Sequence, residues 1–182
     1  MIDVHEHRRA LAELLRPISA AQGNRFGAWC CLALAANPAA LSFLEAQAGR
    51  PEPVEAAVTE LDRAWTGADL STERLQAVRS IEWDPDDIAM DEEASAQAAT
   101  DLLAALEHYL KWQSRRDVAA LTACAECVVN AIDYLENFEL VDAAVGQPVL
   151  RELEAQKAFA RELIAGTLQD EDRLKYHEWL KA

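Results

Sequence analysis

Glycine and proline are scarce in this sequence, with six of each among 182 residues. Runs of β-branched residues, which are typical of strands, are also few. Alanine and leucine dominate instead, and both lose little free energy on entering a helix. With 51% hydrophobic residues, the length suits one domain. We therefore expect an all-α fold, a single-domain bundle of about seven to eight helices over residues 1–182.

Basic residues are also few in this sequence. Lysine and arginine number 17 against 32 aspartates and glutamates, which gives a formal net charge of -15. Such a field repels phosphate backbones and anionic lipid surfaces, so we expect no direct contact with nucleic acid. The same charge is compatible with plain solubility, or with attraction of a basic protein partner. Both interpretations remain open at this stage.

The sequence also lacks targeting and membrane signals. No apolar run reaches the roughly 18 residues of a membrane span. The start, Met1 to His7, has no cationic region that leads into an apolar one, so we expect no secretory signal. The prediction is a cytoplasmic protein that does not enter membranes, with its four cysteines reduced.

Prolines, glycines and capping residues divide the chain into helical segments without a long linker. Gly49 is a typical left-handed helix end, and Asp117 can cap the helix that follows it. The longer segments predicted to be helical are 26–36, 39–48, 53–67, 94–112, 118–135 and 148–163.

The segment over 118–135 has apolar residues at alternating steps of three and four, and we expect it to be the central helix. Its polar residues form a stripe opposite this seam. Asparagine is a poor helix former that is often kept for a specific hydrogen bond, so the stripe is a candidate recognition surface. A solvated helix face is the alternative. The stripe consists of Glu126, Asn130, Asp133 and Asn137.

An acidic cluster precedes the long helix expected at 94–112. Its Asp84-Pro85 start is typical of a helix cap with proline in the first turn, rather than of a metal loop. Desolvating an unpaired carboxylate costs several kcal/mol, so these side chains should lie on the surface, available to a basic partner. The cluster consists of Asp84, Asp86, Asp87, Asp91, Glu92 and Glu93.

A succession of motifs spans most of the chain. It comprises Phe26, Ala28, Cys31, Pro38, Phe43, Gly49, Leu61-Asp62, Trp65, Ser71 to Leu75, Ile81, Asp84 to Asp87, Gly146 to Leu153, Gln156 and Leu163. This order resembles the YjaG-like bacterial proteins, a family of uncharacterised function (domain of unknown function 416). The family's Glu-Arg and Pro-Asn-Tyr signature is replaced here by Leu34 to Ala39, and its Pro-Ala-Asp-Ala-like helix start by Ala96 to Asp101. The resemblance implies an all-α fold and no particular reaction.

No catalytic or metal-binding pattern stands out. Cys124 and Cys127 have the spacing of redox and zinc sites, but they lie inside an expected helix. The adjacent Cys30 and Cys31 cannot easily aim both sulfurs at one ion, so we expect buried, inert thiols. The Glu-x-x-His pairs of di-iron bundles are missing, as are the common nucleophile and phosphate-loop motifs. We predict no catalytic residues, no metal and no cofactor.

Histidines and tryptophans add weaker signals. The spacing of His5 and His7 near the chain start suits a solvated, frayed helix end. Trp29 and Trp65 are expected in the core. Trp112 and Trp179 stand near helix ends among polar residues, where a partner surface is conceivable.

The functional hypothesis is a non-catalytic, acidic protein-interaction module that regulates or neutralises a basic protein partner, as an immunity protein does. The alternative is a small enzyme or small-molecule-binding protein with a pocket between helices. Either would be a monomer or a homodimer. A concave pocket with convergent polar groups would favour the enzyme.

Overall fold

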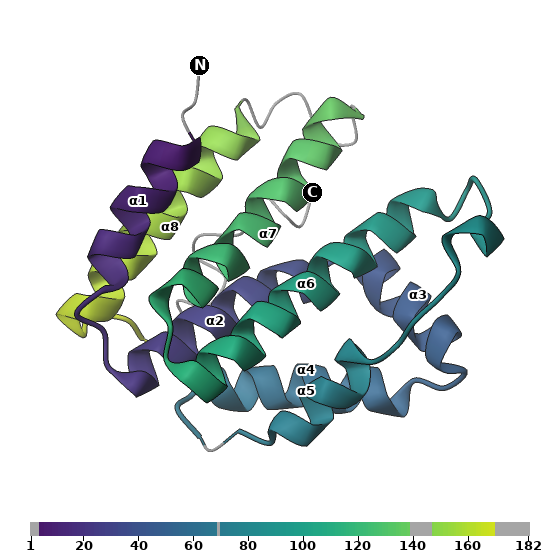
Figure 1. The fold of residues 1–182 in the computed structure, drawn as a ribbon, viewed down its shortest axis with the longest axis horizontal. Coiled ribbons are helices and arrows are strands. Elements are labelled where there is room, and N and C mark those ends of the chain that lie inside the picture. Colours follow the sequence, from purple (N-terminus) through teal and green to yellow (C-terminus); the bar gives the residue numbers. More distant parts are fainter. Residues whose placement is uncertain (1–3, 69, 139–146, 170–182) are drawn as a thin grey trace.

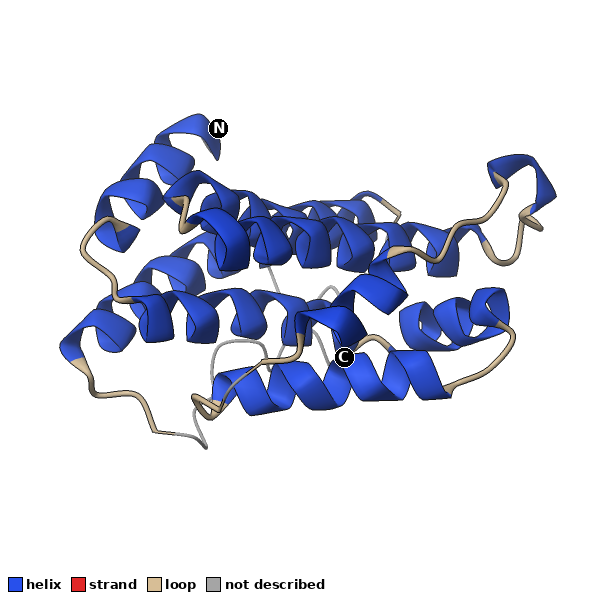
Figure 2. Cartoon of the chain, turned by 60° about the horizontal axis from the view of Figure 1, so that its bottom comes forward, coloured by secondary structure: helices blue, strands red, loops and turns tan. Residues whose placement is uncertain are grey.

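The computed structural model describes residues 4–68, 70–138 and 147–169. Over these residues the fold is all-α, as expected, with eight α-helices, one 3₁₀ turn and no strand (Figure 2). In order they are α1 (Val4–Leu15), α2 (Ala20–Ala35), α3 (Pro38–Ala48), α4 (Glu52–Trp65), α5 (Thr72–Arg79), η1 (Pro85–Asp87), α6 (Glu93–Arg115), α7 (Val118–Asn137) and α8 (Pro148–Ala165).

Helix α2 runs through the middle of the bundle, in contact with α4, α6 and α7 (Figure 1). Ser19 caps its start, in a reciprocal pair of hydrogen bonds with Gln22. Every residue from Phe26 to Ala35 is buried, because this stretch is apolar on all sides. Helix α7, which we expected to be the central helix, packs against α1, α2, α6 and α8 and keeps one polar face exposed.

Helices α6 and α7 form a hairpin with the most extensive helix-to-helix contact in the described chain (Figure 1). At 1.5 Å per residue, the 23 residues of α6 span about 35 Å. Arg116 ends α6 in the left-handed conformation at φ 54°, and Asp117 then caps α7 by accepting a hydrogen bond from the Ala119 N–H. This connection places the start of α6 and the end of α7 at one end of the hairpin.

Two glycines let α2 approach α6 closely. A Cβ atom on Gly23 would lie 2.0 Å from the Trp112 ring, and one on Gly27 would lie 2.4 Å from the Tyr109 ring. Both rings are buried. The spacing of four residues puts the two glycines on one face of α2, and this face is where the aromatic side chains of α6 pack.

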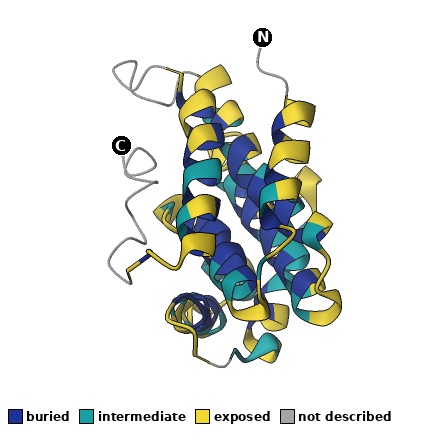
Figure 3. Ribbon diagram, turned by 90° about the vertical axis from the view of Figure 1, so that its left-hand side faces the viewer, coloured by how far each residue is buried: buried dark blue, intermediate teal, exposed yellow. Residues whose placement is uncertain are grey.

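A buried aromatic cluster joins α2, α4 and α8. The Trp29 and Phe159 rings stack with centroids 4.0 Å apart, and Trp65 and Phe26 each lie within 6 Å of Phe159. Buried residues line the inner sides of the helices and exposed residues their outer sides (Figure 3). The prediction that Trp29 and Trp65 are core residues is confirmed.

A buried carboxylate fixes the turn between α4 and α5. Glu60 is fully buried and accepts hydrogen bonds from Arg63, from Arg74 and from the backbone N–H of Ser71, at 2.7–2.9 Å. The Ser71 N–H and the Arg63 guanidinium stabilise the charged form and lower the pKa of Glu60. This ion cluster positions α5, which leads directly into the acidic segment.

One described helix, α7, is long and apolar enough to cross a membrane, with a mean hydropathy of 1.5. Helices α2 and α3 pass the same test as a pair, although they are bent by 86° at their junction. Half of the apolar window of α7 is buried inside the bundle, and core helices of ordinary bundles share these properties. The apolar character of α7 is therefore explained by its packing in the bundle as well as by a membrane span.

Candidate functional site

The acidic cluster lies at the N-terminal end of α6. Seven of the twelve residues from Glu82 to Glu93 are acidic, and none is basic. We call residues 82–93 the acidic segment. Asp84 caps the short 3₁₀ turn by accepting a hydrogen bond from the Asp86 N–H at 3.0 Å. The six predicted carboxylates, Asp84, Asp86, Asp87, Asp91, Glu92 and Glu93, are all exposed.

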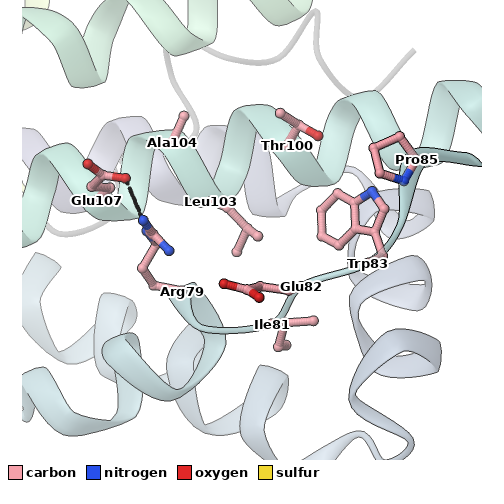
Figure 4. Close-up of a pocket in the computed structure, with 9 residues that line it drawn as sticks. All are labelled: Arg79, Ile81, Glu82, Trp83, Pro85, Thr100, Leu103, Ala104 and Glu107. Carbon is pink, nitrogen blue, oxygen red and sulfur yellow. Dashed lines mark hydrogen bonds and ion pairs between the residues drawn. The ribbon is translucent and has the colours of Figure 1, made fainter.

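A groove of about 470 Å³ borders the acidic segment, between α6 and the chain that leaves α5. Leu103 points from α6 toward Ile81 and Glu82 on the facing chain (Figure 4). Trp83 and Pro85 close the end nearest the acidic segment. The middle of the groove is therefore mainly apolar, and its lining carboxylates are Glu82, from the acidic segment, and the ion-paired Glu107.

An ion-pair network forms the other end of the groove (Figure 4). Arg79 donates two hydrogen bonds to Glu107 Oε2, at 2.8 and 3.1 Å, and Lys111 Nζ lies 2.7 Å from Glu107 Oε1. The hydrogen bonds from Lys111 and Arg79 lower the pKa of Glu107 to about 2. Glu107 stays ionised at every physiological pH, and its charge is balanced by its two neighbours.

Two apolar side chains make this region suitable for contact. Trp83 is half-buried, with its ring packed edge-on against Phe43 at a centroid distance of 5.0 Å. Met90, within the acidic segment, is 88% exposed. Methionine adapts its shape to apolar partners, and tryptophan is enriched in binding hot spots. Apolar contact area thus lies among the carboxylates.

The polar stripe on α7 lies on the exposed side of that helix. Glu126 pairs with Arg8 of α1 at 3.3 Å, and Asn137 donates a hydrogen bond to Asp133 at 3.1 Å. Asn130 is exposed. In the part of the chain that is described, no hydrogen bond or ion pair joins the stripe to the acidic segment. The polar stripe lies on α7, and the acidic segment lies in the connection before α6. They are therefore two separate candidate surfaces.

The cysteines form a buried cluster between α2 and α7. Cys31 Sγ lies 3.9 Å from Cys124 Sγ, and all four thiols are buried and free. Burial raises the pKa values of Cys30 and Cys31 well above the usual range, so these thiols are poor nucleophiles. Within residues 4–68, 70–138 and 147–169, no group of three or more histidines, cysteines or acids is arranged to hold a metal ion.

Two sequence-based expectations need correction. His7 is buried rather than solvated, because it lies on the face of α1 that packs against α8, where its Nε2 is 2.9 Å from Gln156 Oε1. Trp112 is not a surface residue either. It is 3% exposed, packs against Gly23 and donates a hydrogen bond to Asn24 at 3.1 Å. Trp179, the other tryptophan expected near a helix end, lies outside the described residues.

The groove beside α6 was not predicted from the sequence. Its walls come from residues 79–85 and 100–107, which the fold brings together although no sequence pattern links the two stretches. The acids stood out in the sequence, but nothing local shows that Leu103 lies in the same groove as Ile81. The available signal was an apolar residue and a tryptophan next to the densest run of acids in the chain.

No family model matches this chain, and neither the curated proteins nor the solved structures that were compared with it gave a match. The likeness to the YjaG-like family therefore stays a prediction from sequence. Over the described residues the molecule is an all-α bundle with a mainly apolar groove next to its acidic segment.

Proposed function

We propose that this chain is a non-catalytic binding protein, and that the groove beside α6 takes an amphipathic, basic helix from a protein partner. The observation that carries the proposal is the combination of an apolar groove, lined by Ile81, Trp83 and Leu103, with the seven carboxylates of the adjacent acidic segment. A groove of this kind favours a helix that has one apolar face and one cationic face.

The apolar and the basic side chains of such a partner would contact different parts of this surface. Leucine-like side chains would bury apolar area against Leu103 and Trp83, while lysine or arginine would lie near the acidic segment. Because the carboxylates of this segment are exposed, they contribute more to the rate of encounter and to the choice of partner than to affinity. The apolar contacts would then supply most of the binding free energy.

The most concrete form of this function is regulation or neutralisation of a cationic protein in the cytoplasm, as immunity proteins perform. The polar stripe on α7, with exposed Asn130 and Asp133, would serve as a secondary contact. A small enzyme or a small-molecule-binding protein is the competing hypothesis. It is less well supported at this groove, because Arg79 and Glu107 neutralise each other and Thr100 bonds back to its own helix.

The apolar part of the proposal is tested by titrating the protein with a synthetic helix that has leucine on one face and lysine on the other. Leu103→Gln places a polar side chain in the groove and should weaken binding about tenfold or more, as loss of a central apolar contact does. Leu110→Gln is the matched control, since Leu110 lies two turns further along α6, is equally half-buried and is not part of the groove.

Calorimetry measures both affinities, and circular dichroism confirms that both variants stay helical. The expected result is a large loss of affinity for Leu103→Gln and little change for Leu110→Gln. Equal affinities in the two variants would refute the groove as the binding site. Binding of a leucine–glutamate helix as tight as that of the lysine helix would refute the requirement for a basic partner.

A further inference from the structure

A hollow lined by four arginines lies between α1 and the start of α7, where α6 ends. Its volume is about 450 Å³. Arg8, Arg9 and Arg16 come from α1, and Arg116 comes from the turn between α6 and α7. In a chain with 17 basic and 32 acidic residues, this local surplus of positive charge runs against the charge of the whole molecule.

The positive charge in the hollow is only partly balanced. Arg8 pairs with Glu126 at 3.3 Å, and Arg16 pairs with Glu13 at 2.6 Å. Arg116 donates its hydrogen bond to Asn24, which is neutral. Among the residues that the structure describes, Arg9 makes no ion pair or hydrogen bond.

The acidic residue in the lining does not supply the missing counter-charge in full. Asp117 Oδ1 accepts the hydrogen bond of the Ala119 N–H at 2.9 Å, as the cap of α7. The lining thus holds four arginines and one aspartate, and after the pairs with Glu126 and Glu13 the charges of Arg9 and Arg116 remain without a carboxylate partner among the described residues. The positive end of the α7 dipole lies at the same place and adds to the potential.

Guanidinium groups present paired N–H donors that match the oxygens of phosphate, and they stay charged at every physiological pH. The rest of the lining is apolar or small, with Ala12 and Val118 contributing. The volume lies in the range of about 300–1,000 Å³ that is usual for small-molecule sites. A nucleic acid is a poor candidate, because the net charge of -15 repels a long polyanion.

We propose that the arginine hollow, defined by Arg8, Arg9, Arg16 and Arg116, binds the phosphate group of a small phosphorylated molecule. Arg9 and Arg116 contact the phosphate oxygens, and the apolar lining receives the remainder of the ligand. This site is separate from the groove beside α6, so it holds or fails independently of the proposed protein partner.

Calorimetric titration with inorganic pyrophosphate at constant ionic strength tests the site. The unchanged protein should bind one equivalent, and Arg9→Ala should weaken binding about tenfold, as loss of one charge-assisted contact does. Arg116→Gly should act similarly, and it keeps the fold because glycine adopts the positive φ of this position without strain. Arg50→Ala is the control, since Arg50 is exposed in the turn after α3 and outside the hollow.

Weakened binding in Arg9→Ala and Arg116→Gly, with no change in Arg50→Ala, supports the site. No binding to the unchanged protein overturns it, and so does an equal loss in all three variants, which would report net charge alone. A parallel titration with citrate distinguishes phosphate from carboxylate ligands. Citrate binding as tight as that of pyrophosphate would overturn the assignment to phosphate.

Discussion

At the scale of single residues, Gly27 sets the distance between α2 and α6. A Cβ atom there would lie 2.4–3.2 Å from three atoms of the Tyr109 ring, which is fully buried and has no room to move. Overpacking costs about 1–3 kcal/mol, whereas alanine gains about 1 kcal/mol over glycine in a helix interior. The steric cost is the larger of the two.

We therefore expect Gly27→Ala to lower the free energy of unfolding by up to about 2 kcal/mol, measured by urea denaturation. Combining it with Tyr109→Leu, which removes the ring, should give a double mutant that is less destabilised than the sum of the single changes. Strict additivity of the two substitutions would show that the glycine does not serve this contact.

Asp101 is a buried carboxyl on α6 that we expect to lower stability at neutral pH. It is 7% exposed, and its hydrogen bond from Gln97 is long, at 3.3 Å. Burial raises its pKa above the usual value, so the folded state binds the proton more tightly than the unfolded state does. The ionised carboxylate therefore costs stability above this raised pKa, and the cost disappears below the pKa of the unfolded chain.

Asp101→Asn, which keeps the shape and the acceptor oxygen, should raise the unfolding temperature at pH 7. The gain should shrink as the pH falls through the folded-state pKa of Asp101. Thermal unfolding at several pH values measures this, with Asp86→Asn as an exposed control that should change stability by less than about 0.5 kcal/mol. A constant difference from pH 7 to pH 3 would contradict the electrostatic explanation.

At the scale of elements, a small polar network docks α1 onto the bundle. His7 Nε2 donates to Gln156 Oε1, and Gln156 Nε2 donates to the Ala125 carbonyl and to Glu152. Burial is the main effect on His7 and lowers its pKa below 6.5. Because the folded-state pKa is below the unfolded one, the stability linked to His7 is complete above pH 6.5 and declines as the pH falls from there toward the folded-state value.

Hydrogen exchange of the α1 amides should therefore become faster, relative to intrinsic rates, between pH 7.5 and pH 5.5. His7→Gln retains a donor for Gln156 but does not titrate, so its α1 protection should change little over this range. If the two proteins showed the same pH dependence, the docking of α1 would not depend on His7.

The helix ends could be predicted from sequence because their signals are local. Gly49 and Asp117 each mark a boundary that the structure has. The positions of His7 and Trp112 could not, since each depends on which face of its helix meets another helix far away in the chain. The groove escaped prediction for the same reason: Leu103 and Ile81 share no local pattern, and only the packing of α5 and α6 brings them together.

At the scale of the whole molecule, the charge is unevenly distributed. Helix α6 begins at the acidic segment and ends, about 35 Å away, at Arg115 and Arg116 beside the arginine hollow. Both groups complement the helix dipole, with acids at the N-terminal end and arginines at the C-terminal end. The acidic segment and the arginine hollow thus lie near opposite ends of α6.

On the proposed function, the acidic segment steers a basic helix into the groove beside α6. Long-range attraction of this kind weakens as salt shortens the Debye length from about 10 Å at 0.1 M to about 3 Å at 1 M. A charge-matched pair of variants separates local steering from net charge: Asp86→Asn with Asp87→Asn in the acidic segment, and Glu52→Gln with Glu55→Gln at the exposed start of α4.

Stopped-flow measurement of the association rate with the leucine–lysine helix, at both salt concentrations, is the most direct test. We predict slower association at 1 M salt for the unchanged protein, and at 0.1 M a rate for the Asp86 and Asp87 variant that is well below that of the Glu52 and Glu55 variant. Equal rates in the two variants, or a rate that does not depend on salt, would contradict the claim.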